Sequence, residues 1–337
     1  MNYSIGLDIS KSLISVYIPI NNLSIEIGNS SKDLKKLISK LKKLYKKELD
    51  KIVFVYEPTG SYSDLVKKFC FEKEIKCFIV NPKQSSNFAK SMGERNKTDK
   101  VDAKLLSKAI VLANDEDIKV PIYDKRVEDM KTLMSYYKFV VKSRVRLNNH
   151  LESIVAKDGL AYTIDSLKDE IKEYKIKEQD ILSQIMDIIN KDDQLKQDLA
   201  NIKSITGIGD KSGIVLLHLF LKYPNANQRE ITSLVGLDPI EKSSGSSVRG
   251  KIRISKAGSK IYRGSMFMSV MTAIRYSQHF KSFFERLQAK GKHTTLIQIA
   301  VMRKMILIAH SLYKNNQKFD DERYNKDCGR QITKEVA

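Results

Sequence analysis

Cysteine is scarce in this sequence of 337 residues, which contains only Cys70, Cys77 and Cys328. Three scattered cysteines are too few for a disulfide framework or a zinc site, so a reduced compartment suits the chain. Long apolar runs are also missing, because a stretch such as Ile214–Leu217 is far shorter than the roughly 20 residues that span a bilayer. The first ten residues, MNYSIGLDIS, lack a basic segment followed by an apolar one. We therefore expect no secretory signal and a cytoplasmic, nucleoid-associated protein.

Acidic residues are outnumbered, since 40 Asp and Glu stand against 60 Lys and Arg and leave a net charge of +20. A basic surface attracts polyanions, and nucleic acid is the first candidate, although membrane-surface attachment or a merely lysine-rich composition gives the same balance. Residues 242–284 contain no acidic residue but nine basic ones: Lys242, Arg249, Lys251, Arg253, Lys256, Lys260, Arg263, Arg275 and Lys281. We expect this segment to contact phosphates.

The first third of the chain alternates between strand and helix patterns. Apolar runs bounded by polar residues predict strands within residues 3–27, with a turn at Asn21-Asn22, and over residues 52–56 and 76–80. Apolar residues at helical spacing predict helices over residues 32–47, 63–72 and 100–112. This order indicates a mixed α/β sheet in a domain of residues 1–120.

Long helices are predicted between residues 127 and 199. One seam begins at Val127 and Met130, and a second, heptad-like seam runs from Leu167 to Leu199, with Asp158-Gly159 between the two. A helical hairpin or a dimerising coiled coil fits this pattern, and two ordinary packed helices of one protomer fit it equally well. We assign residues 121–200 to this helical segment.

The remaining chain is predicted to be mostly helical, with a domain over residues 201–320 and a polar tail over residues 321–337. Gly207 and Gly209 stand just before the apolar run Ile214–Phe220. Glycines at a helix start let the backbone approach a phosphate, as in a helix-hairpin-helix motif, although a plain helix-entry turn has the same sequence. The fold class is therefore α/β plus all-α.

Four acidic residues stand where chemistry is expected. Asp8 lies inside the first predicted strand, where a carboxylate is disfavoured without a partner or a function, and Glu57 directly follows residues 52–56. Asp99 and Asp102 share one face at the start of a helix. Carboxylates that meet at one sheet edge suit Mg²⁺ or Mn²⁺, and two such ions can hold the attacking and leaving oxygens of a phosphoryl transfer.

Each acid also has a structural interpretation. Asp99 and Asp102 are equally explained as a helix N-cap and a first-turn acid that complements the helix dipole. Glu57 can be a surface residue at a strand end. Asp8 is the hardest to explain in this way, and the order of all four acids favours the metal site.

Four ordered blocks resemble the DEDD transposases of insertion sequences, the family that includes Piv-type DNA invertases and bridge-RNA-guided recombinases. The blocks are GLDISK from Gly6 to Lys11, EPTGSY from Glu57 to Tyr62, VNPKQ through KTDKVDAK from Val80 to Lys104, and GLDP, SSG and ISKAG between Gly236 and Gly258. The pairs Gly291-Lys292 and Arg303-Lys304 resemble the closing helices of the family.

The resemblance implies a RuvC-like domain with the RNase H fold, in which Asp8, Glu57, Asp99 and Asp102 bind the metal. It also implies that Ser244, before Gly245, is the nucleophile that forms a phosphoserine link to DNA. The chain departs from the family pattern by offering Ser243, Ser246 and Ser247 nearby, so the assignment among these serines stays open. A structured noncoding guide RNA and a homo-oligomer, dimer or tetramer, are implied as partners.

Phosphate contacts are expected from basic side chains and from the two glycines at the helix start. These residues are Lys97, Lys100, Lys104, Gly207, Gly209, Lys242, Arg249, Lys251, Arg253, Lys256, Lys260 and Arg263. The five histidines form no ligand or triad pattern, and His150 and His310 are expected to be packing or surface residues. Two other functions remain open: a RuvC-like junction nuclease in which water attacks, and a non-catalytic nucleic-acid-binding protein.

Overall fold

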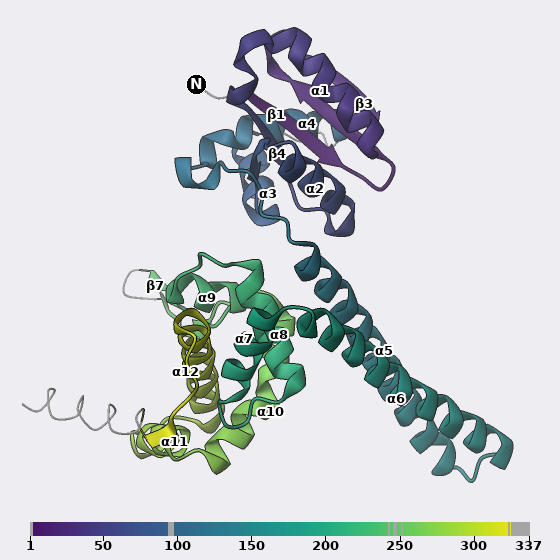
Figure 1. Cartoon of the computed structure of the whole chain (residues 1–337), viewed down its shortest axis with the longest axis vertical. Coiled ribbons are helices and arrows are strands. Elements are labelled where there is room, and N and C mark those ends of the chain that lie inside the picture. Colours follow the sequence, from purple (N-terminus) through teal and green to yellow (C-terminus); the bar gives the residue numbers. More distant parts are fainter. Residues whose placement is uncertain are drawn as a thin grey trace, which may run out of the picture. The chain divides into compact units, whose positions relative to one another are not determined.

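The computed structural model describes residues 3–93, 98–241, 243–244, 248–250, 252–322 and 324. The chain forms two compact units, Met1–Tyr123 and Asp124–Ala337. The first is a mixed sheet covered by helices, and the second is mostly helical (Figure 1). The predicted combination of an α/β part and a mostly helical part is confirmed.

A five-stranded sheet organises the first unit in the order β3-β2-β1-β4-β5. Its strands are β1 (Tyr3–Ile9), β2 (Leu13–Ile18), β3 (Leu23–Gly28), β4 (Ile52–Tyr56) and β5 (Lys76–Ile79). β1, β2 and β3 pair as an antiparallel meander, whereas β4 and β5 run parallel to β1. All five strands lie where the apolar runs predict them.

Alternate side chains of the strands enter two separate cores. On one face, Leu7 and Phe54 pack with residues of α1 (Ser31–Tyr45) and α2 (Asp64–Glu72). On the other face, Val53 and Val55 pack with Leu106 and Ala109, at the end of α4 (Asp99–Lys108) and in the 3-10 turn that follows it. Both faces are covered because a sheet with parallel strands buries apolar residues on each side.

Helix α3 (Pro82–Ser91) was not predicted from the sequence, which indicates only that a strand ends near Val80, before Asn81-Pro82. The Asn81 side chain caps this helix by accepting a hydrogen bond from the backbone N–H of Lys83 at 2.9 Å. Proline suits the first helical position because the N–H that it lacks has no partner there. The same two residues therefore end β5 and begin α3.

The second unit opens with two long helices, α5 (Lys125–Val155) and α6 (Ala161–Asn190), which pack against each other as an antiparallel hairpin (Figure 1). The turn contains Asp158, whose φ of 49° is left-handed, followed by Gly159, as the sequence predicts. The hairpin forms within one chain, and pairing between protomers stays a prediction.

The seam of the hairpin contains a charged pair. Glu178 is 7% exposed among apolar residues of α6 such as Ile171 and Ile181. Its carboxylate accepts a hydrogen bond from Nε of Arg144 on α5 at 2.5 Å. A carboxylate so deeply buried needs a charged partner, so this pair fixes the register of the two helices.

The predicted continuous seam from Leu167 to Leu199 is wrong, because the helix stops at Asn190 and α7 (Asp193–Lys203) begins after a break. Asp192 caps α7 by accepting hydrogen bonds from the backbone N–H groups of Gln194 and Leu195. Capping by Asp192 starts a new helix here in place of a further turn of α6. Apolar periodicity alone does not reveal such a break.

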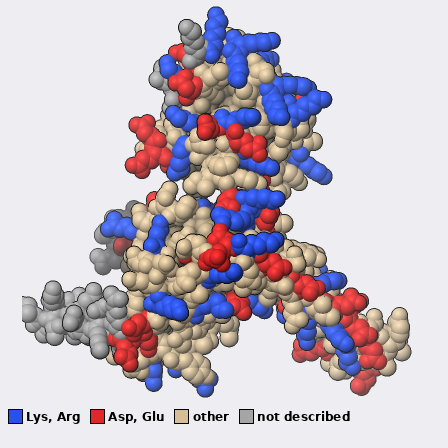
Figure 2. Space-filling model, viewed as in Figure 1, with Lys and Arg blue, Asp and Glu red and all other residues tan. Residues whose placement is uncertain are grey.

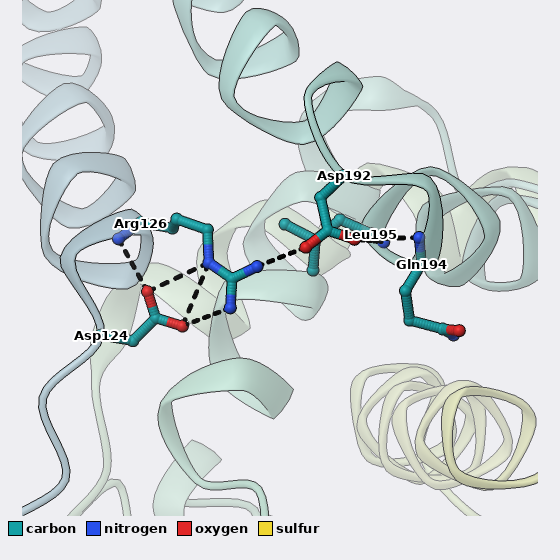
Figure 3. Close-up of polar contacts among 5 residues, drawn as sticks. All are labelled: Asp124, Arg126, Asp192, Gln194 and Leu195. Carbon is teal, nitrogen blue, oxygen red and sulfur yellow. Dashed lines mark hydrogen bonds and ion pairs between the residues drawn. The ribbon is translucent and has the colours of Figure 1, made fainter.

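Figure 3 shows how this cap is tied to the start of the hairpin. Asp124 caps α5 through the backbone N–H of Arg126, and the Arg126 guanidinium bonds both Asp124 and Asp192. The hydrogen bonds from Arg126 hold the pKa of Asp124 below its ordinary value. One arginine thus joins the N-termini of α5 and α7.

The rest of the second unit is a helical bundle with a small β arm. Its helices are α8 (Asp210–Lys222), α9 (Gln228–Val235), α10 (Lys260–Tyr276), α11 (Gln278–Ala289) and α12 (Thr294–Asn315). By length and composition α12 alone, among the described residues, could cross a membrane, but half of its apolar window is buried. Val301 and Met305 of α12 lie in the core of the bundle, which accounts for its apolar composition.

We predict that Glu178→Ala destabilises the second unit by about 1–3 kcal/mol, because Arg144 loses a largely buried charged partner. For a unit of this size the midpoint of thermal unfolding falls by roughly 2–4 °C per kcal/mol. Asp180→Ala, at an exposed position of the same helix, is the control and should change stability by less than about 0.5 kcal/mol. Equal unfolding midpoints for both variants would contradict the proposed role of the pair.

Candidate active site

The parallel pairing of β1 and β4 places two of the predicted acids side by side. The pairing of β1 with β4 ends at Leu7 opposite Tyr56, so Asp8 and Glu57 are the next residues in the same register. Neighbouring strands lie about 4.8 Å apart. Asp8 is half-buried in β1, and Glu57 directly follows β4 and is also half-buried. Both backbones therefore lie at the carboxyl edge of the central strands.

Helix α4 comes unusually close to β1. A Cβ atom added to Gly6 would clash with the carbonyl oxygen of Ala103 and would lie 2.7 Å from the backbone nitrogen of Ser107. The Ser107 hydroxyl also donates to the carbonyl oxygen of Ser4 at 2.6 Å. Ser107 thus lies beside Ser4 and Ala103 beside Gly6, so α4 runs antiparallel to β1.

This alignment determines where the other two acids lie. One helical turn before Ala103 is Asp99, and two residues beyond Gly6 is Asp8, so both are near the same end of β1. Asp102 directly precedes Ala103. The N-cap of α4 is Thr98, which accepts from the backbone N–H of Val101 at 3.3 Å. Asp99 is therefore not the cap, and both acids belong to the first helical turn.

The four acids share one edge of the sheet, but their carboxylates do not surround one point. Glu57 Oε2 accepts a hydrogen bond from the hydroxyl of Ser85 at 2.6 Å, and Asp99 is exposed. Across the part of the chain that the structure describes, no three His, Cys, Asp or Glu residues are grouped to hold a metal ion. The donor set contains only oxygen, which is the chemistry of a hard divalent cation.

Ser85, which no sequence pattern singled out, lies one turn after Pro82 in α3. Its hydroxyl bonds both Glu57 and the carbonyl oxygen of Pro82 at 3.1 Å. The hydrogen bond orients the carboxylate of Glu57 and links α3 to the end of β4. The Asn81-Pro82 helix start was the available signal, because it places residue 85 on the first turn beside the sheet edge.

The segment with the predicted serines begins in a small β arm. β6 (Pro239–Ile240) pairs antiparallel with β9 (Arg253–Ile254), and nested within them β7 (Ser243–Ser244) pairs with β8 (Val248–Arg249). The backbone of Ser244 is the last of β7. Three residues expected nearby, Gly245, Ser246 and Ser247, lie outside the described residues.

Two sequence blocks meet at the base of this arm. The hydroxyl of Ser255 donates to Asp238 Oδ1, and the backbone N–H of Ser255 donates to the carbonyl oxygen of Asp238 at 2.8 Å. A Cβ added to Gly258 would clash with the carbonyl oxygen of Leu234. Gly236 has a φ of 72°, a left-handed conformation that favours glycine. GLDP and ISKAG thus form one folded support.

Arg263 also belongs to this support. Its guanidinium Nη1 donates to the carbonyl oxygens of Val235 at 2.5 Å and Gly258 at 3.0 Å. These bonds give the half-buried arginine a structural role in the base of the arm. Its contact with nucleic acid stays a prediction.

The other residues predicted to bind nucleic acid are distributed over both units. Lys100, Arg253, Lys256 and Lys260 are exposed, whereas the ammonium of Lys104 lies 5.6 Å from the ring centre of Tyr17. Lys97, Lys242 and Lys251 lie outside the described residues, and of Arg249 only the backbone, in β8, is described. These contacts stay predictions.

The two glycines before α8 are not equivalent. A Cβ added to Gly207, whose φ is 94°, would clash with the carbonyl oxygen of Ser269 and lie 2.9 Å from the backbone nitrogen of Ala273. A Cβ added to Gly209 would meet nothing within 4 Å. Gly207 is explained by its packing against α10, and Gly209 alone leaves its backbone open to a ligand.

Helix α1 also carries a lysine-rich half, which its apolar pattern did not single out. Six lysines on this half are exposed: Lys32, Lys35, Lys36, Lys40, Lys42 and Lys43. The only acid of α1, Asp33, pairs with Lys36 at 3.0 Å. In Figure 2 basic side chains gather over this part of the first unit. The 3.6-residue spacing of the lysines was the signal for this face.

Three histidines of the bundle, His218, His279 and His310, are buried. Burial lowers the pKa of His218 to about 4 and that of His279 to about 4. His310 is buried in the core, and burial lowers its pKa as well, whereas His150 is exposed on α5. The buried histidines are neutral at pH 7, and the burial of His310 agrees with its expected role as a packing or surface residue.

Comparisons with known proteins match both parts of the chain to transposases. A family model described as a transposase, of the DEDD type of IS110, matches residues 5–157, and one described as the transposase IS116/IS110/IS902 family matches residues 199–285. The pilin gene-inverting proteins of Moraxella bovis and Moraxella lacunata are each 28% identical over 280 residues, 79% of this chain and 81% of theirs. An uncharacterized 43.6 kDa protein of insertion element IS110 from Streptomyces coelicolor is 29% identical over 113 residues, 32% of this chain and 27% of its own.

We predict that Gly6→Ala displaces α4 from β1 and destabilises the first unit by about 1–3 kcal/mol or more, since the added methyl group overlaps helix backbone. Thermal unfolding and protease resistance would measure this loss. Gly264→Ala is the control, because its Cβ meets nothing within 4 Å and alanine favours a helix interior. The control should stabilise the chain by about 0.5–1 kcal/mol. If Gly6→Ala were as stable as the original chain, α4 could not approach β1 as described.

Proposed function

Because the chain belongs to the IS110 family of DEDD transposases, we propose that it cuts and rejoins DNA strands through a metal-dependent attack by Ser244. The family makes it a DNA-rearranging enzyme, and the names of two relatives describe the inversion of a pilin gene. One structural observation carries the finer proposal: β1, β4 and α4 bring all four acids to the same edge of one sheet.

We infer a RuvC-like variant of the RNase H fold for the first unit. The strand order β3-β2-β1-β4-β5, with an antiparallel meander followed by two parallel strands, supports this inference. So do the positions of the acids, since open α/β sheets place their sites beyond the carboxyl ends of their strands.

Asp8, Glu57, Asp99 and Asp102 would hold Mg²⁺ or Mn²⁺. The bound ions would stabilise negative charge on the attacking and leaving oxygens of a phosphoryl transfer. The hydrogen bond from Ser85 restricts Glu57, and the contact of α4 with Gly6 keeps Asp99 and Asp102 near Asp8. The protein therefore positions carboxylate oxygens by backbone packing as well as by side-chain hydrogen bonds.

Ser244 supplies the nucleophile in this proposal. Its Oγ forms a bond to the phosphorus while the bond from phosphorus to one sugar oxygen breaks, and the proton of the serine leaves with that oxygen or to solvent. A sugar hydroxyl of another strand then attacks the phosphoserine, restores the serine and joins the strands. No bond energy is lost, so rejoining needs no nucleotide cofactor.

A homo-oligomer would complete the site, with Ser244 of one protomer acting on DNA held at the acids of another. A dimer or a tetramer built from dimers would satisfy this arrangement. We also propose a structured noncoding RNA that selects donor and target DNA. The acid-free segment of residues 242–284 and the lysine face of α1 supply positive charge for both nucleic acids.

The acids are tested by isosteric substitution. Asp8→Asn, Glu57→Gln, Asp99→Asn and Asp102→Asn should each reduce recombination by roughly 100-fold or more, because a ligand of the metal ions is lost. DNA binding should remain, and Ca²⁺ should not replace Mg²⁺, since Ca²⁺ takes longer bonds and looser geometry. Glu26→Gln, an exposed acid on β3, is the control. Full activity of any one of the four variants would remove that residue from the site.

The serines are tested one at a time. Ser244→Ala should abolish strand exchange and any covalent adduct, whereas Ser243→Ala, Ser246→Ala and Ser247→Ala should keep at least part of the activity, because one hydroxyl lies in line with the leaving oxygen. Labelled DNA on denaturing gels, followed by peptide mapping of the retarded species, would identify the residue. An adduct at another serine would correct the assignment. Cleavage with no adduct in any variant would favour a nuclease in which water attacks.

A further inference from the structure

A cleft of about 910 Å³ lies within the second unit, between the hairpin, the start of α8 and one side of α10. Its walls are largely apolar and include Met134 and Val141 of α5, Ile185 of α6 and Val215 of α8. A volume of this size accommodates a drug-sized ligand with a flat apolar part. None of these residues belongs to the acid site or to the serine arm.

The rim of the cleft is basic. Four exposed lysines line it: Lys138, Lys142, Lys211 and Lys260. The one acid in the lining, Asp210, forms an ion pair with Lys203. The rim therefore carries an excess of positive charge and suits an anionic ligand whose apolar part enters the cleft.

Gly264 leaves one wall of the cleft open. It lies inside α10, one turn from both Lys260 and Met268, and a Cβ added to it would meet nothing within 4 Å. Glycine destabilises a helix interior relative to alanine, and no packing contact explains its presence here. In contrast, a Cβ on Gly213 of α8 would lie 3.0 Å from the Leu199 side chain. The open wall at Gly264 suits a ligand that lies close to the helix backbone.

An aromatic ring lies in the opposite wall. Tyr137 of α5 is half-buried, and the ammonium of Lys211 lies 5.3 Å from its ring centre. Lys211 is exposed, so a flat aromatic group can take its place over the ring. Met268, 69% exposed on α10, offers a second apolar surface. Flat aromatic groups linked to negative charges are the chemistry of a nucleic-acid strand.

We propose that this cleft binds an unpaired nucleobase, with the phosphates of its strand along the four lysines. The inference rests on the proposed function, since it names how this DNA-rearranging enzyme holds a strand away from the reacting phosphate. The base must be unpaired because a base within a duplex is stacked and cannot enter the cleft. Stacking on aromatic side chains depends little on sequence, so the cleft accepts different bases.

Binding of the full chain to three labelled DNAs tests the proposal: a single strand, the matching duplex, and that duplex with one bulged nucleotide. Fluorescence anisotropy should show that the original chain prefers the single strand and the bulged duplex over the perfect duplex. Gly264→Met places an uncharged side chain on the open wall of the cleft and should weaken binding to the two DNAs with unpaired bases roughly 10-fold. Binding to the perfect duplex should change less than about two-fold, because phosphate contacts dominate there.

Two further variants separate the causes. Tyr137→Leu keeps an apolar wall but removes the ring, and it should weaken the same two DNAs and reduce the quenching of a 2-aminopurine placed at the bulge. Phe267→Met, an exposed position of α10 outside the cleft, is the matched control and should bind all three DNAs as the original chain does. Gly264→Met should unfold no earlier than the original chain, because methionine favours a helix and has room there.

Each outcome decides a different question. Unchanged binding of all three DNAs by Gly264→Met and Tyr137→Leu would overturn the base site and leave the proposed function standing. A change in oligomeric state without a change in DNA binding would overturn it in favour of a second copy of the chain as the occupant. If the original chain bound none of the three DNAs at low salt, the proposed function itself would fail.

Discussion

The candidate site depends on the close contact between α4 and β1 at Gly6. Any side chain at this position would overlap the carbonyl oxygen of Ala103, so the absence of a Cβ lets the helix lie directly on the strand. The hydrogen bond from Ser107 to Ser4 holds the same alignment one turn further along. Because α4 runs antiparallel to β1, its first turn, with Asp99 and Asp102, lies at the end of the strand that carries Asp8. Packing of two backbones thus brings together acids that are more than 90 residues apart in the sequence.

In the second unit, too, some motif residues support the structure, and others are proposed to carry out the chemistry. The blocks around Gly236 and Gly258 build the base of the β arm that leads to Ser244. The side chains of Asp238, Ser255 and Arg263 form hydrogen bonds within this base. The proposed attack by Ser244 needs its hydroxyl held in line with the phosphate, and a folded base beneath the arm would help to hold it.

In the hairpin of α5 and α6, charged pairs hold the helices in one arrangement. Arg126 ties the starts of α5 and α7 together through Asp124 and Asp192, and the pair of Arg144 and Glu178 fixes the register of α5 against α6. With the register fixed, Tyr137 and the lysines of α5 face the start of α8 and the open side of α10 across one cleft. A buried ion pair can help to specify a single arrangement, and here that arrangement lines the cleft of the second unit.

The sequence by itself determined the strands, most of the helices and the combination of an α/β part with a mostly helical part, because apolar periodicity is a local signal. It also singled out four acids, whose role in binding metal stays a prediction. Helix α3 and the break before α7 escaped it, since Asn81 and Asp192 act through capping hydrogen bonds that periodicity does not measure. Only the tertiary structure decided that Gly207 packs against α10, that Arg263 supports the arm and that Ser85 holds Glu57. These roles depend on partners distant in the sequence, and the identity of a residue does not state which backbone atoms will lie within reach of it.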